Sequence, residues 1–64
     1  MAISDRELWA CAAHILRQYG DRAPAHIAER IADLALKSDT DGVTTWKQIA
    51  DRYDRLVLSE IPPQ

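Results

Sequence analysis

Apolar residues recur at helical spacing along almost the whole of this chain, and the pattern is interrupted at only two places, near Gly20 and over residues 38–42. Apolar positions three and four residues apart form one face of an amphipathic helix, whereas strict alternation would indicate a strand. The pattern therefore predicts an all-α fold with helices at about 5–19, 22–37 and 40–58, followed by a tail over 59–64.

The expected helix ends carry residues that suit helix caps. Ser4 and Glu7 have the spacing of a capping box, which satisfies backbone donors at a helix start. Gly20 can adopt the left-handed conformation that often ends a helix. Asp21 is then expected to cap the second helix, with Pro24 in its first turn, where a missing N–H costs little.

One domain over residues 1–64 is the most that this length allows. Cys11 is the only cysteine, so no disulfide within the chain can support the fold. The composition, 47% hydrophobic and 28% charged, is that of a globular protein. The sequence shows neither a signal peptide nor an apolar run of about 20 residues, and a lone thiol fits a reducing compartment. A cytoplasmic protein without membrane contact is expected.

The three helices are expected to pack as a short antiparallel up-down-up bundle. Trp46 is expected to anchor the core, so that Trp46→Ala would cost roughly 3–5 kcal/mol. The residues expected to form this core are Leu8, Ile15, Ile27, Ile31, Leu34, Trp46, Ile49, Tyr53 and Leu56.

The first two helices have apolar arcs of roughly 200°, wider than one third helix can cover. Their outer flanks are therefore expected to meet a protein partner, most simply a second copy in a two-fold homodimer. The alternative is that the helices bend and the tail folds back over these flanks. The candidate interface residues are Trp9, Ala13, Leu16, Ala25, Ala32 and Leu36.

Cys11, His14 and His26 are the residues that invite a catalytic or metal-binding interpretation. A structural zinc site needs four ligands and a catalytic one needs three, and no second cysteine exists. A thiol nucleophile needs an activating base and an oxyanion site, and a chain this small has little room for a pocket of about 300 Å³. We therefore expect no catalytic residue, cofactor, metal or small-molecule substrate.

The run from Asp39 to Gly42 resembles part of an EF-hand loop, but the alignment fails at both ends. With Gly42 at the sixth position, Lys37 and Gln48 occupy the first and twelfth, where calcium requires carboxylates. Asp39 or Asp41 is better explained as the cap of the third helix.

The closely spaced acidic residues are expected to be ordinary solvated neighbours of basic ones. Glu29 and Asp33 lie one turn apart with Lys37 a further turn on, and Asp51 precedes Arg55 by four residues. Such i,i+4 pairs support exposed helices and do not indicate acid–base chemistry.

A helix-turn-helix DNA-binding regulator, built from the second and third helices, is the alternative function. Thr44, Lys47 and Gln48 on the third helix could contact bases. The net charge of −2 and the aspartates at the start of that helix argue against it, because DNA binders usually carry a basic stripe. The preferred function is a small protein-interaction or regulatory module with no enzymatic activity.

One run of residues extends from the expected first turn into the expected third helix: Gly20, Asp21, Ala25, Ala28, Arg30, Leu34, Asp39, Gly42, Trp46 and Ile49. In this run the chain resembles a group of short proteobacterial helical proteins of uncharacterised function. The resemblance covers Leu8 to Leu56, and the chain departs from the group at Ser38, where the second turn usually has a glycine. The resemblance implies a helical fold and a bacterial cytoplasm. It also implies that Arg30 bridges to a carboxylate or to turn carbonyls and that Trp46 anchors the core.

Overall fold

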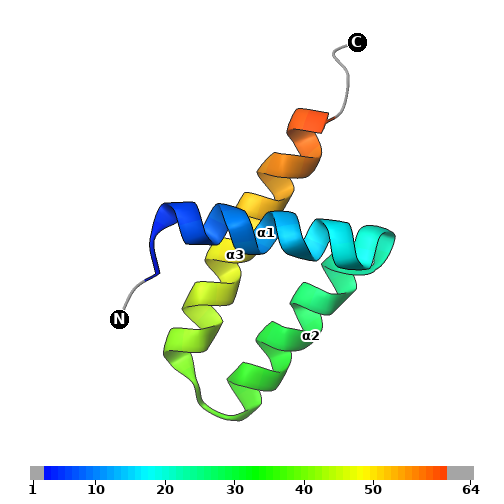
Figure 1. The fold of residues 1–64 in the computed structure, drawn as a ribbon. Helices are drawn as coiled ribbons and strands as arrows, with labels where there is room; N and C mark the ends of the chain where they lie inside the picture. Colours follow the sequence, from blue (N-terminus) through cyan, green and yellow to red (C-terminus); the bar gives the residue numbers. More distant parts are fainter. Residues whose placement is uncertain (1–2, 61–64) are drawn as a thin grey trace.

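Three α-helices and one 3₁₀ turn make up the part of the chain that the computed structural model describes (Figure 1). That part is residues 3–60, with side chains for residues 3–58. The helices are α1 (Asp5–Tyr19), α2 (Ala23–Leu36) and α3 (Thr40–Glu60), and the 3₁₀ turn η1 (Gly20–Arg22) joins the first two. Residues 3–60 contain no strand, so the prediction of an all-helical chain is confirmed.

Helix α1 begins at the expected cap and ends at the expected glycine. The Glu7 N–H donates to Ser4 Oγ at 3.2 Å, and Ser4 Oγ donates to Glu7 Oε1 at 3.1 Å. The second bond differs from a capping box, in which the glutamate accepts from the backbone N–H of the cap residue. Gly20 has φ of 53° and its N–H donates to the Leu16 carbonyl, which closes the last turn.

The chain changes direction at η1, which begins at Gly20 with its positive φ and ends at Arg22 in the right-handed helical region. Asp21 lies inside this turn and does not cap α2, which corrects the sequence prediction. The residue before α2 is Arg22, whose side chain makes no capping hydrogen bond. Pro24 occupies the first turn of α2, where its fixed φ suits a helix and the missing N–H has no helical acceptor.

Helix α2 ends in a Schellman motif with a serine in the position that usually holds glycine. The Asp39 N–H donates to the Leu34 carbonyl at 2.9 Å, and the Ser38 N–H donates to the Ala35 carbonyl at 3.0 Å. These two bonds define the motif, which requires a left-handed residue at its fifth position. Ser38 adopts that conformation, with φ of 61°.

Helix α3 starts at an aspartate cap and extends past the expected end. The Gly42 N–H donates to Asp39 Oδ1 at 2.9 Å, so Asp39 supplies the cap that the sequence left open between two aspartates. The helix runs to Glu60, so the first two residues of the predicted tail belong to it. Residues 61–64 of that tail lie outside the described residues.

The helices are not arranged as the predicted up-down-up bundle. Figure 1 shows α2 and α3 side by side in opposite directions, whereas α1 lies across α3. The reason lies in η1, because a three-residue 3₁₀ corner turns the chain without a loop that would return α2 alongside α1. Helix α3 is 21 residues long and α2 is 14, so α3 projects about 10 Å beyond its neighbour.

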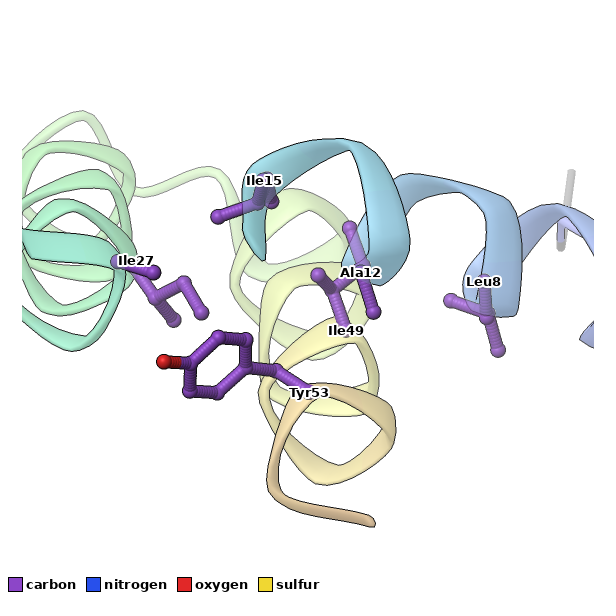
Figure 2. Packing of buried hydrophobic residues seen from close by; sticks show 7 residues of the cluster. Leu8, Ala12, Ile15, Ile27, Ile49 and Tyr53 are labelled. Carbon is purple, nitrogen blue, oxygen red and sulfur yellow. The ribbon is translucent and has the colours of Figure 1, made fainter. Parts of the chain in front are cut away.

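The core lies where α1 crosses α3 and α2 approaches both (Figure 2). Ile15, Ile27 and Ile49 come from the three helices and are each about 95% buried. Ala12 and Ala23 have no exposed surface, although the sequence did not predict them as core residues. The buried set is Leu8, Ala12, Ile15, Ala23, Ile27, Leu34, Ile49 and Tyr53.

Three of the predicted core residues lie at the margin of this core. Ile31, Trp46 and Leu56 are half-buried and pack against it. Trp46 is therefore not the central anchor that the sequence predicted, and its truncation is expected to cost less than the value for a fully buried tryptophan.

Candidate functional site

The α1 part of the predicted interface is partly covered within the chain. Trp9, Ala13 and Leu16 are all half-buried. Leu16 packs against the core. Trp9 lies beneath the guanidinium of Arg52, whose central carbon is 5.6 Å from the centre of the indole ring. Contacts within the chain thus cover much of this flank of α1.

Trp9 belongs to a polar network that ties the start of α1 to α3. Its Nε1–H donates to Asp5 Oδ2 at 3.1 Å, and Arg52 donates to Asp5 Oδ1 from Nε at 2.9 Å and from Nη2 at 2.6 Å. Arg52 also contacts Asp51. The hydrogen bonds from Arg52 hold the pKa of Asp5 below its usual value, and those to Asp5 raise the pKa of Arg52.

The α2 part of the predicted interface is exposed. Ala25 and Ala32 belong to a row with Ala28 and Ala35, whose spacing of three and four residues places all four on one side of the helix. Leu36 follows this row and is 87% exposed, more than any other large hydrophobic residue among those described. The six predicted interface residues therefore divide into a half-covered α1 group and an open α2 group.

A groove of about 390 Å³ lies on the side of α1 that faces away from Trp9, Ala13 and Leu16. Residues of all three helices line it. This volume falls within the range of ligand pockets, and it corrects the expectation that so small a chain has little room for one. Ile15 and Ile49 are buried residues of the core that also line the groove. The full lining is Ala10, Cys11, His14, Ile15, Gln18, Tyr19, His26, Trp46 and Ile49.

Aromatic rings form one wall of the groove. The rings of Tyr19 and His26 stack with their centres 4.0 Å apart. His26 meets Trp46 edge to face at 5.8 Å, and the guanidinium carbon of Arg30 lies 5.5 Å from the centre of the Trp46 ring. Arg30 Nη1 also lies 3.9 Å from Asp33 Oδ2, an exposed contact that agrees with the carboxylate bridge implied by the resemblance.

This wall, which we call the aromatic wall (Tyr19, His26 and Trp46), was missed by sequence reasoning. Tyr19 is the last residue of α1, and His26 lies beyond the corner in α2. The two rings face each other only because η1 turns the chain between them. The sequence feature that could have indicated this wall is the presence of Tyr19 and His26 on either side of the Gly20 turn.

Cys11 and His14 both line the groove. Cys11 is half-buried and His14 is exposed. Within residues 3–60, no three His, Cys, Asp or Glu side chains are placed so that they could hold a metal ion. The i,i+4 pairs also form as predicted, with Lys37 Nζ 3.1 Å from Asp33 Oδ2 and Arg55 Nε 3.1 Å from Asp51 Oδ2.

Comparison with known proteins places the chain in a family. A family model described as a family of unknown function, DUF6961, matches residues 4–60. The chain belongs to DUF6961. No curated protein and no solved structure matches this DUF6961 chain.

The match to DUF6961 covers both candidate surfaces. The groove residues, from Ala10 to Ile49, and the exposed α2 row both lie inside the matched range. Among residues 3–60 of this DUF6961 chain, no helix is both long and apolar enough to cross a membrane.

Proposed function

We propose that this protein is a small protein-interaction module, without catalysis, that docks on a partner protein through the groove. The observation that carries the proposal is an apolar groove that adjoins the core and has an aromatic wall with an arginine beside it. Tryptophan, tyrosine and arginine are the residue types most enriched at the energetic centres of protein interfaces. Trp46, Tyr19 and Arg30 supply all three.

The proposed role uses a surface that folding leaves open. Tyr19 is 37% exposed even though its ring stacks on His26. An aromatic ring held in place by a neighbour loses little conformational entropy on binding, which favours affinity. The resemblance to proteobacterial proteins supports a bacterial cytoplasm as the proposed setting of this module.

The proposal is tested by affinity capture from host cells with two matched variants. Ala10 lines the groove and Ala32 lies in the open α2 row, and both are exposed alanines within helices. Ala10→Arg obstructs the groove, and Ala32→Arg places the same side chain on the other surface. The proposal predicts that Ala10→Arg removes a partner that wild type and Ala32→Arg retain. A partner kept by Ala10→Arg would refute docking in the groove.

A second candidate function is self-association through α2, and Leu36 favours it. A leucine that is 87% exposed beside a row of exposed alanines is what a helix-pairing face would present. This candidate predicts a two-fold dimer in sedimentation equilibrium that Leu36→Glu dissociates. A monomer at high protein concentration would exclude it.

The helix-turn-helix alternative has less support from the geometry. In that motif, two helices cross at roughly 90–120°. Here α2 and α3 lie side by side in opposite directions (Figure 1). Thr44, Lys47 and Gln48 are exposed, but Asp39 and Asp41 stand at the start of the same helix. Salt-dependent binding of random duplex DNA at micromolar concentration would be the result that favours this alternative.

A further inference from the structure

Asp41 is the only aspartate in the sequence that a glycine follows, and the pair lies in the first turn of α3. The backbone nitrogen of a residue that follows aspartate can attack the side-chain carbonyl carbon of that aspartate and close a succinimide ring. A glycine leaves this attack unobstructed, because it has no side chain. The chain contains no asparagine, the other residue that readily forms such a ring. Asp41 is therefore the residue of this sequence most suited to the reaction.

The structure restrains the nucleophile of this reaction and leaves the electrophile free. The Gly42 N–H donates to Asp39 Oδ1 at 2.9 Å. Asp41 is exposed, and among residues 3–58 no hydrogen bond or ion pair holds its carboxylate. Ring closure requires Asp41 to leave the helical backbone conformation, and the ends of helices are where the backbone opens most readily. The cap at Asp39 is thus the contact that opposes the reaction.

We propose that Asp41 is a site of spontaneous conversion of aspartate to isoaspartate, and that the Asp39 cap controls its rate. The Gly42 nitrogen bonds to Asp41 Cγ and loses its proton, and one carboxyl oxygen leaves as water. Water then reopens the succinimide, and attack at the main-chain carbonyl of Asp41 leaves the chain linked through Cγ. The product has the same mass and oxidation state as the reactant, so no co-reactant is needed.

The conversion would alter the start of α3, whatever binds in the groove. It lengthens the main chain by one carbon between Asp39 and Val43, whose N–H donates to the Asp39 carbonyl at 3.0 Å. Gly42 lies close to the buried Leu34, because a Cβ added to the glycine would be 3.1 Å from Leu34 Cδ2. The first turn of α3 must therefore rearrange beside a core residue, and the converted protein is expected to have a lower Tm. It would also be a substrate for enzymes that methylate isoaspartyl carboxylates.

The test is to age the full chain at neutral pH and physiological temperature and to measure isoaspartate by peptide mapping. Trypsin cleaves after Lys37 and Lys47, so the peptide over 38–47 contains Asp39 and Asp41 and no other aspartate. Chromatography separates its two isomers, and fragmentation in the mass spectrometer assigns the altered residue. Asp39→Ala is expected to accumulate isoaspartate at Asp41 about fivefold faster than wild type, the change in opened population that loss of a typical cap produces.

Matched variants separate the local cap from overall stability. Asp39→Ser keeps a capping oxygen, so its rate should stay close to that of wild type. Ser4→Ala removes the cap of α1 and leaves Asp39 in place, so it lowers stability without opening α3 and should also convert at the wild-type rate. Asp41→Glu should abolish the product, because glutamate closes a ring far less readily. Circular dichroism checks that each variant stays helical.

Three results would overturn the proposal. The first is an equal rate of conversion in wild type and Asp39→Ala. The second is an equal acceleration in Ser4→Ala, which would mean that unfolding of the whole chain controls the rate. The third is an absence of isoaspartate at Asp41 when the wild-type chain is aged in urea, which would show that the pair is unreactive. If Asp39→Ala lost its helicity, Asp39→Thr, a weaker cap than serine, would take its place and should give a smaller acceleration.

Discussion

Replacing Ser38 with glycine should stabilise this protein, although the change removes a side chain. Ser38 has φ of 61°, and a left-handed conformation costs a non-glycine residue roughly 1–2 kcal/mol. Glycine relieves that strain but gives the unfolded chain more freedom, which costs about 0.5–1 kcal/mol. The residue is exposed, so loss of its side chain removes no buried contact. The net gain in the free energy of unfolding therefore lies between about 0 and 1.5 kcal/mol, with about 0.5–1 kcal/mol in the middle of that range.

The assay is thermal unfolding followed by circular dichroism at neutral pH. For a domain of this size, 1 kcal/mol shifts Tm by roughly 4–8 °C, so Ser38→Gly should raise it by about 2–8 °C. Ser38→Ala is the matched control, because alanine meets the same steric strain, and its Tm should stay close to that of wild type. A lower Tm for Ser38→Gly, or an equal rise for Ser38→Ala, would refute the assignment of strain to this residue.

Three further outcomes follow from other local contacts. The lowered pKa of Asp5 means that its link to Arg52 stabilises the fold above the unfolded-state pKa of about 3.9 and is lost as pH falls through the lower folded value. Asp5→Asn should therefore flatten the fall of Tm on acidification below about pH 4, and an unchanged acid profile would count against the link. Gly42→Ala should not raise Tm, although alanine favours a helix by about 1 kcal/mol, because its Cβ would lie 2.8 Å from Asp39 Oδ2 and disturb the cap. Ser4→Ala should lower stability by about 0.5–2 kcal/mol in urea titration, and no change in the midpoint would mean that the cap of α1 contributes nothing.

Helix ends were largely predictable because caps are local chemistry. Ser4, Gly20 and Asp39 act within a few residues of the backbone groups that they satisfy, so their roles can be read from the sequence. Asp21 shows the limit of that reasoning. It has the side chain of a cap, but it lies inside η1, and the cap position of α2 falls on Arg22.

The arrangement of the helices could not be predicted in the same way. Helical spacing identifies apolar faces but not the angle at which they meet, and the corner at Gly20–Arg22 decides that angle. Ala12 and Ala23 were not predicted as core residues because alanine is common on both the buried and the exposed sides of a helix, and only the packed structure shows that they are buried. The groove depends on the same corner, because it brings His26 against Tyr19.

The link between Asp5 and Arg52 joins residues 47 positions apart in a sequence of 64 residues. Helix α1 precedes α3 in the sequence, so a ribosome synthesises it before the helix that it crosses. The apolar face of α1 therefore stays partly exposed until α3 has been made.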